Sequence, residues 1–275
     1  MTLQVVADSS CDVPANLLRQ CGVATVPIPI DIDGREFHEG IDITTPEFYE
    51  RVAQSDTLPT TSQPSPAAFA DTFRGLSSKG QIVCLTVTSK LSGTYQSACL
   101  GAHLSGADVT VFDSLTASVG HGLQVLRACQ LAKAGRTAAE ALAELTAYRN
   151  GLTTLVLLDT LENIVKGGRL TKLQWNLSKI LDIRVLLRDA EGEIAVLSKV
   201  RGKKKAMERM LHTIVGLHPD LSDRDVGISH FKNPDGVEEL KQWLAERCHP
   251  RSFVVNDMGP TMATYAGEGG LIVAF

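Results

Sequence analysis

Residues 81–103 read QIVCLTVTSKLSGTYQSACLGAH and combine an apolar run, a loop rich in hydroxyl groups and a helical pattern. The apolar run at 81–86 is typical of a strand buried on both faces, and the residues from 95 onward predict a helix. The same order of strand, polar loop and helix recurs on both sides of this stretch. It predicts a parallel sheet with helices on both faces.

Working outward, the strand predicted before this stretch is 3–7, and the one after it is 108–112. The hairpin at 27–38 turns at Asp33-Gly34, a strong turn dipeptide. Pro46 and Pro66 each occupy a first-turn position that predicts a helix start, with Ser65 as the cap of the second helix. The other predicted helices are 14–21, 117–134 and 137–150, the last opened by a capping box of Thr137 and Glu140.

After Gly151 the pattern changes to hairpins and longer strands. The predicted strands are 152–158, 185–188, 193–200, 225–230, 253–256 and 271–275. The predicted helices are 161–166, 173–181, 203–216 and 234–247. We therefore predict an N-terminal parallel-sheet α/β domain at 1–150 and a C-terminal α+β domain at 151–275.

Composition excludes several classes of protein. The 275 residues are 44% hydrophobic and 21% charged with a net charge of −4, which does not suit a general nucleic-acid surface. The longest apolar runs are far shorter than the roughly 20 residues of a membrane span, so no membrane insertion is expected. The six cysteines form no C-x-x-C pair and no signal peptide pattern precedes them, which predicts a reducing, cytoplasmic location.

The segment 59–66, PTTSQPSP, places hydroxyl groups and an amide between two predicted helices. Uncharged donors of this kind suit a carboxylate or a phosphate. Helix capping accounts for Ser65 but leaves Thr60, Thr61 and Ser62 unexplained. Both the capping and the binding interpretations stay open at this point.

The loop at 89–94, SKLSGT, follows a strand and precedes a helix. Ligands of open parallel sheets bind beyond the carboxyl ends of strands, and a helix N-terminus offers free N–H groups to an anion. Gly93 would allow close approach of the backbone. Capping by Ser92 or Thr94 is the structural alternative, and we favour an anion site. The loop lacks the G-x-x-x-x-G-K-[ST] pattern, so ATP binding is not predicted.

Two segments carry clustered cations: KGGR at 166–169 and KVRGKKK at 199–205. Cations are unfavourable at a helix N-terminus, so the second cluster indicates a phosphate or acidic partner unless it is a solvated helix start. Asp8-Ser9-Ser10 and Asp113-Ser114 are interpreted as turns or caps. The glycine-rich stretch 259–270 predicts either a turn or close packing on a ligand or partner, and no hydrolase or metalloprotease motif is present.

Taken together and in order, these segments resemble the DegV family, including the FakB-type fatty-acid-binding proteins of bacterial fatty acid kinases. The resemblance runs almost end to end. Its landmarks are DSSCD at 8–12, DG at 33–34, EGIDI at 39–43, PTTSQPSP at 59–66, LSGTYQSA at 91–98, DS at 113–114, KGGR at 166–169 and GP at 259–260.

The resemblance implies that one palmitate-like, long-chain fatty acid lies between the two domains, with no cofactor. It implies a carboxylate held by Thr61 and Ser92, with Ser62, Gly93 and Thr94 as neighbours. A separate ATP-dependent kinase subunit would phosphorylate the bound acid, so the chain is not expected to catalyse alone. The resemblance associates phosphotransfer or partner contact with Arg169 and Arg201. A non-catalytic lipid sensor and a stand-alone small-molecule transferase are the alternatives.

The chain departs from the family pattern near its C-terminus. Tyr265 stands where the pattern has histidine, and Glu268 stands where it has a second proline. Tyrosine can donate or accept a hydrogen bond but is not cationic near neutral pH. This departure bears on phosphotransfer more than on lipid binding, and it makes Tyr265 a third candidate for partner contact.

Overall fold

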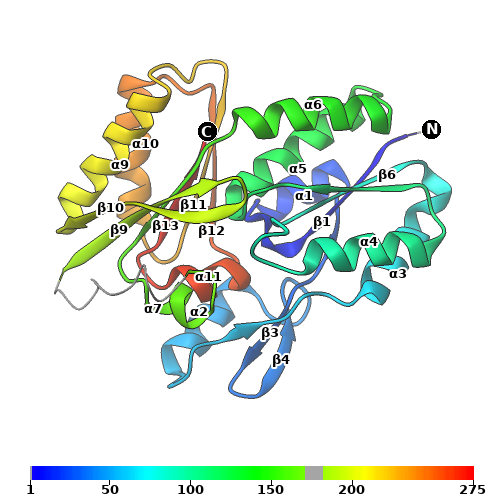
Figure 1. Cartoon of the computed structure of the whole chain (residues 1–275), viewed down its shortest axis with the longest axis horizontal. Helices are drawn as coiled ribbons and strands as arrows, with labels where there is room; N and C mark the ends of the chain where they lie inside the picture. Colours follow the sequence, from blue (N-terminus) through cyan, green and yellow to red (C-terminus); the bar gives the residue numbers. More distant parts are fainter. Residues whose placement is uncertain (1, 171–181) are drawn as a thin grey trace.

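The structure is a computed structural model that describes residues 2–170 and 182–275. The helix predicted at 173–181 lies outside the described residues. Within them, the strands form three sheets, and the two larger sheets lie in opposite halves of the molecule (Figure 1).

The N-terminal sheet is parallel throughout, as predicted. Its order is β2 (Ala24–Val26), β1 (Gln4–Asp8), β6 (Ile82–Thr86) and β7 (Val109–Asp113). One face packs on α1 (Ala15–Cys21), α5 (Ser118–Lys133) and α6 (Ala138–Gly151), and the other packs on α3 (Pro66–Leu76) and α4 (Thr94–Ser105). Alternation of side chains in β1 sends Val5 to one layer and Val6 to the other, which explains the continuous apolar run.

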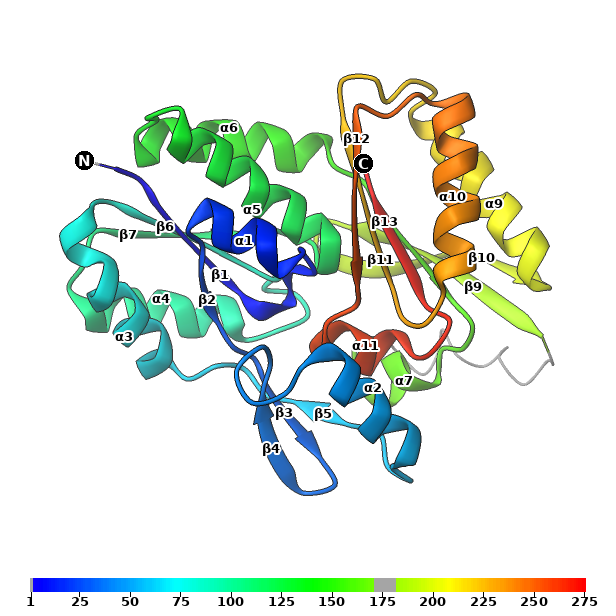
Figure 2. The same ribbon diagram turned by 180° about the vertical axis from the view of Figure 1, so that it is seen from behind.

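A small antiparallel sheet extends from this domain beside α2 (Thr45–Gln54), as Figure 2 shows. Its order is β4 (Arg35–His38), β3 (Pro29–Ile32) and β5 (Thr60–Thr61). The predicted hairpin is confirmed: Asp33 and Gly34 both have positive φ, 53° and 79°, as a tight hairpin turn requires. The sequence missed β5 and β2, because strands of two and three residues are too short to show alternation.

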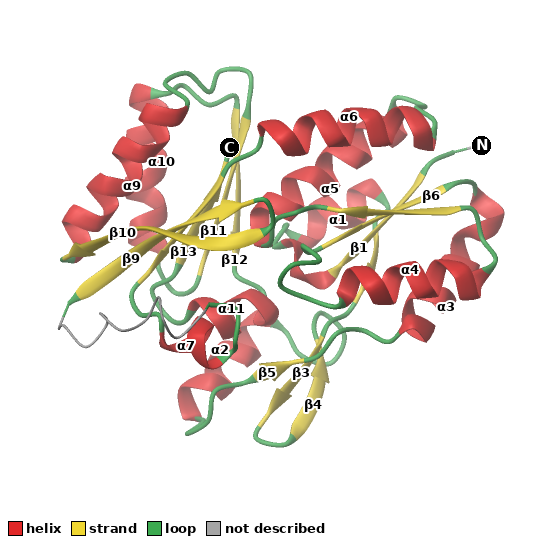
Figure 3. Cartoon of the chain, viewed as in Figure 1, coloured by secondary structure: helices red, strands yellow, loops and turns green. Residues whose placement is uncertain are grey.

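The C-terminal sheet has six strands (Figure 3). Its order is β10 (Glu193–Arg201), β9 (Ile183–Ala190), β8 (Thr154–Leu158), β13 (Leu271–Ala274), β11 (Asp225–His230) and β12 (Ser252–Asp257). Neighbours are antiparallel except β11 and β12. Helices α9 (Lys203–Leu217) and α10 (Pro234–Arg247) cover one face, which confirms the α+β prediction.

The glycine-rich stretch 259–270 contains a helix that the sequence did not predict, followed by a turn at 268–269. Most of it forms a helix, α11 (Pro260–Ala266), with Gly259 as N-cap and Gly267 as C-cap. Pro260 is favourable at the first position because its missing N–H has no helical partner there. Gly267 ends the helix with φ of 73°. A second short helix, α7 (Glu162–Lys166), packs against α11 and ends at Gly167, as predicted.

Helix α5 joins the two large sheets. It contacts β1 and β6 on one side and β11 and β13 on the other. Two glycines make the approach possible: a Cβ on Gly122 would lie 2.2 Å from the Cys11 carbonyl oxygen, and one on Gly227 would lie 2.3 Å from Val119. The predicted domain boundary near residue 150 falls at the end of α6 (Gly151) and stays a prediction.

In the two described ranges, no helix combines the length and the apolar character needed to span a bilayer.

Candidate functional site

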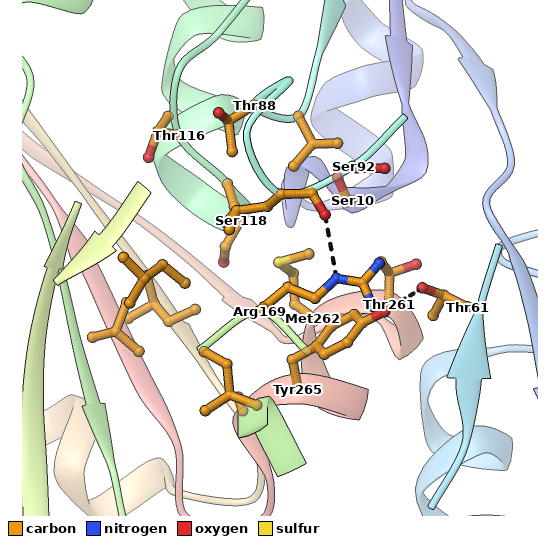
Figure 4. A pocket seen from close by; sticks show the side chains of 18 of the residues that line it. Ser10, Thr61, Thr88, Ser92, Thr116, Ser118, Arg169, Thr261, Met262 and Tyr265 are labelled. Carbon is orange, nitrogen blue, oxygen red and sulfur yellow. Dashed lines mark hydrogen bonds between the residues drawn. The ribbon is translucent and has the colours of Figure 1, made fainter. Parts of the chain in front are cut away.

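A cavity lies between the carboxyl ends of the parallel strands and the inner face of the six-stranded sheet (Figure 4). It has about 1080 Å³ of empty space, counting the part open to solvent. Its position matches the rule that ligands of open α/β sheets bind beyond the strand ends.

Most of the cavity wall is apolar. The apolar side chains come from both domains and from α11; they are Ile28, Val87, Leu91, Val156, Leu158, Ile164, Ile194, Met262 and Ile272. These side chains carry no charge. A wall of this kind accepts a hydrocarbon chain and gives a long polar ligand no partners.

Hydroxyl groups gather at one side of the cavity. Thr61 in β5 and Tyr265 in α11 share a hydrogen bond of 2.6 Å between their hydroxyl oxygens, so segments 204 residues apart meet here. Ser62 and Ser92 also line the cavity. Thr61 and Ser62, the residues of the binding interpretation, therefore line a cavity. Ser65 caps α3 as expected.

The start of α4 reaches the same side. Its N-cap is Gly93, which has no side chain to satisfy the first N–H groups. Ser92 and Thr94 bond to each other at 2.8 Å between hydroxyl oxygens, and Ser92 Oγ also accepts from the backbone N–H of Thr94 at 3.3 Å. Thr94 is buried and does not line the cavity. The other N–H groups of the first turn of α4 favour an anion at this point.

The space beside Gly93 is occupied by a neighbouring side chain. A Cβ there would lie 1.6 Å from Oε1 of Gln63, so the space beside the glycine is filled by a side chain. Gln63 lines the cavity and donates a hydrogen bond from Nε2 to Ser97 at 3.0 Å. A side chain at position 93 would have to displace the end of Gln63.

Arg169 supplies the positive charge of the site. Its Nε donates to the Leu91 carbonyl at 3.2 Å, and its Nη1 donates to the Gly167 carbonyl at 2.6 Å. Its guanidinium lies 4.6 Å from the centre of the Tyr265 ring (Figure 4). The backbone bonds and the ring hold the cation at the cavity wall.

The side of the cavity nearest β8 and β9 carries a second group of polar residues. Thr88 donates to the Gly192 carbonyl at 3.0 Å, and Thr116 bonds Thr154 at 3.0 Å. Burial raises the pKa of Asp189 to about 6, although hydrogen bonds from Thr116 and Gly192 oppose this. These groups satisfy one another, so they make a closed wall.

Other candidates lie away from the cavity. Arg201 ends β10, is exposed and does not line the cavity. Asp8 accepts hydrogen bonds from the backbone N–H of Ser10 and Val87, which confirms its structural interpretation. The charged side chains of 203–205 are exposed at the start of α9.

The described residues contain no cluster of His, Cys, Asp and Glu that could hold a metal. Polar cavity-lining residues that the sequence did not single out include Thr116, Ser118, Thr154 and Asp189. The stretch 259–270 was singled out for a turn or for close packing on a ligand or partner, but the helix α11 that brings Thr261 and Met262 to the cavity was not predicted. Pro260 directly after Gly259 was the available signal of a helix start.

Comparison with known proteins agrees with this geometry. The chain matches the family described as "Uncharacterised protein, DegV family" over residues 2–275. A DegV domain-containing protein of Caldanaerobacter subterraneus is 30% identical over 275 residues, covering 99% of this chain and 98% of that protein.

Two solved structures are also similar. The first is a DegV-family protein of Thermus thermophilus, described for its fatty acid binding, which is 32% identical and has a TM-score of 0.91. The match covers 100% of this chain and 99% of that protein's chain. A DegV-family protein of Ruminococcus gnavus refined with vaccenic acid is 27% identical with a TM-score of 0.91, and both chains are covered completely.

Proposed function

We propose, on the premise that the chain belongs to the DegV family, that it binds one long-chain fatty acid in the cavity. The carboxylate would then be presented to a separate ATP-dependent kinase subunit. The observation that carries the proposal is an apolar cavity with hydroxyl groups, a helix N-terminus and an arginine gathered on one side. The fatty-acid binding of the Thermus thermophilus relative supports it.

The apolar wall supplies the affinity. A C16 chain places about 14 methylenes out of water, at ~0.8 kcal/mol each, or roughly 11 kcal/mol before costs. Loss of translational and rotational freedom offsets several kcal/mol of this. The remainder suffices for tight binding of chains of that length.

The hydroxyl groups orient the head. We assign the carboxylate to Thr61 and Ser92, with the first N–H groups of α4 and the side chain of Arg169 beside it. A buried carboxylate needs several hydrogen bonds or a charge partner, and this side of the cavity offers both. Ser62 and Gly93 border the same position, and Thr94 supports Ser92 from behind.

Phosphorylation of the carboxylate would need an outside donor, because the chain has no phosphate-binding loop. Arg169 is half-buried at the cavity and Arg201 is exposed, so we propose that both face the kinase subunit. The six free cysteines support a reducing compartment such as the cytoplasm.

A second candidate function is a lipid sensor or carrier with no kinase partner. Tyr265 favours it, because its hydroxyl is engaged by Thr61 and it brings no positive charge. The two functions share the lipid site and differ in the fate of the carboxylate.

Denaturing lipid extraction of the purified protein, with native mass spectrometry of the intact chain, tests the lipid site. One fatty acid per chain is expected. A protein that carries no lipid and refuses added palmitate would overturn the proposal.

Incubation of the palmitate-loaded protein with a fatty acid kinase subunit and ATP separates the two functions. Acyl phosphate trapped as the hydroxamate is expected for the kinase-linked carrier. A loaded protein that yields none with an active kinase subunit would be a sensor or simple carrier.

A further inference from the structure

Two carboxylates are buried directly behind the cavity wall, where the two domains meet. Asp12 is 3% exposed and Glu39 is 8% exposed, and neither lines the cavity. Both come from the N-terminal half, at the end of the 3-10 turn Ser9–Cys11 and after β4. Their hydrogen bonds reach across to the C-terminal half.

Asp12 holds the beginning of α11 and the end of β11. Its Oδ1 accepts from the backbone N–H of Gly259 at 2.7 Å. Its Oδ2 accepts from Ser229 at 2.9 Å and from Ser118 at 2.5 Å. Ser118 lines the cavity, so the carboxylate fixes both a wall residue and the N-cap of α11.

Glu39 holds the first turn of the same helix. Its Oε2 accepts from Thr261 at 2.5 Å and from Ser9 at 2.8 Å. A Cβ on Gly259 would lie 2.0 Å from Oε1 of Glu39 and 3.1 Å from Oδ1 of Asp12. The two carboxylates therefore converge on one backbone position, and glycine is the residue that leaves room for them.

In the part of the chain that the structure describes, no opposite charge balances the pair. Among residues 2–170 and 182–275, no Lys, Arg or His makes an ion pair with Asp12 or Glu39. The titratable groups that interact with the pair are Asp8, Cys11 and Tyr49. Farther out, His121 lies 4.0 Å from Asp8, and His230 lies 3.5 Å from Asp257. Two adjacent carboxylates without a cation cannot both be charged at low cost.

Helix α11 connects this pair to the head-group side of the cavity. Thr261 and Tyr265 are four residues apart, so they lie on one face of the helix. Glu39 bonds the first, and the second bonds Thr61. A displacement of the start of α11 would carry Tyr265 away from Thr61.

We infer that Asp12 and Glu39 are positioning residues whose hydrogen bonds across the domain interface, acting through α11, set the geometry of the fatty-acid carboxylate site, and that protonation of the pair strengthens this arrangement. The inference rests on the proposed function and goes beyond it, because it adds pH control by residues that do not touch the ligand. Protonation of one carboxyl removes the repulsion within the pair.

The titration has a defined direction. Burial raises the pKa of Asp12 to about 7, and burial together with the charge of Asp12 raises that of Glu39 to about 8. A carboxyl with a raised pKa stabilises the hydrogen-bonded position of α11 most below its ordinary pKa of about 4, and this support is lost as pH rises through the raised value. This position of α11 should therefore become less stable between about pH 5 and pH 8, by up to tenfold per pH unit for one proton.

The test uses Glu39→Gln, whose amide oxygen can still accept from Ser9 and Thr261 but which stays neutral at every pH. Glu50→Gln, an exposed position on α2, makes the same change in charge and is the matched control. Palmitate affinity is measured at intervals from pH 6 to pH 8.5. Titration of the palmitate carboxyl is common to all three proteins and cancels in their ratio.

We expect the affinity of Glu39→Gln, relative to wild type, to rise with pH, while Glu50→Gln follows wild type. Equal pH profiles for wild type and Glu39→Gln would overturn the inference. Amide exchange of 259–265 without ligand provides an independent reading, with protection expected to fall with pH in wild type but not in Glu39→Gln. If wild type binds no palmitate but its protection of 259–265 still falls with pH, the proposed function is refuted and the role of Asp12 and Glu39 stands. If the protection in wild type does not change with pH, that role is refuted.

Discussion

The hydroxyl of Thr61 is the most direct point at which to perturb the head-group site. Thr61→Val removes this hydroxyl and keeps the β-branched shape that suits β5. The lost bond to Tyr265 is neutral and should cost about 0.5–1.5 kcal/mol of folding stability. The variant should therefore fold.

The effect on ligand affinity should be larger than the effect on stability. A hydrogen bond to a charged carboxylate is worth about 1.5–3 kcal/mol, and 1.4 kcal/mol is tenfold in affinity. Palmitate should bind roughly 10- to 150-fold more weakly. The roughly 11 kcal/mol from the acyl chain is unchanged, so loading persists at higher ligand concentration.

The assay is displacement of a fluorescent fatty acid by palmitate and by hexadecanol. Hexadecanol has the same chain and no charge, so Thr61→Val removes only a hydrogen bond between neutral groups. The affinity for hexadecanol should therefore fall less, by about 2- to 12-fold. Thr60→Val is the matched control, because Thr60 is the neighbouring, exposed residue of the same strand. Equal palmitate affinity of Thr61→Val and Thr60→Val would refute the assignment of the carboxylate.

Three further outcomes are expected. The double variant Thr61→Ala/Ser92→Ala should lower acyl-phosphate formation more than fatty-acid loading, and equal formation by variant and wild type would contradict this. Gly167→Ala should displace the Tyr265 ring, because the new Cβ would lie 2.5 Å from Cε1; palmitate affinity should fall, and an unchanged value would show that the ring has room to move. Asp189, whose pKa is raised to about 6, should lose its contribution to stability as pH rises from about 4 through 6. The free energy of unfolding in urea should therefore change less with pH in Asp189→Asn than in wild type, and an equal change in both proteins would exclude this contribution.

Much of the fold could be read from local patterns. The buried strand β6, the Asp33-Gly34 turn, the Ser65 cap and the Thr137 capping box all appear as predicted. Each depends on neighbouring residues alone, through burial, positive φ or a hydrogen bond within one turn. Helix α11 was not predicted, because it is short, lies between glycines and owes its stability to packing.

The candidate site could be read in part. The threonines and serines of 59–66 and 89–94 were recognised from composition and from their place beside a strand end. Their meeting with Tyr265 could not be predicted, because 204 residues separate it from Thr61. Gly93 was recognised for a ligand, and the structure shows that Gln63 occupies the space beside it.

The sequence by itself determined the order of elements, the parallel character of the first sheet, and the hydroxyl-rich loops at its strand ends, since these follow from periodicity and local hydrogen bonding. The tertiary structure alone decided the cavity, because its wall is assembled from strands of both sheets and from α11. It also decided that Asp12 and Glu39 are both buried, with no cation paired to them among the described residues. Burial and charge compensation depend on which distant segments pack together, and no local pattern encodes that.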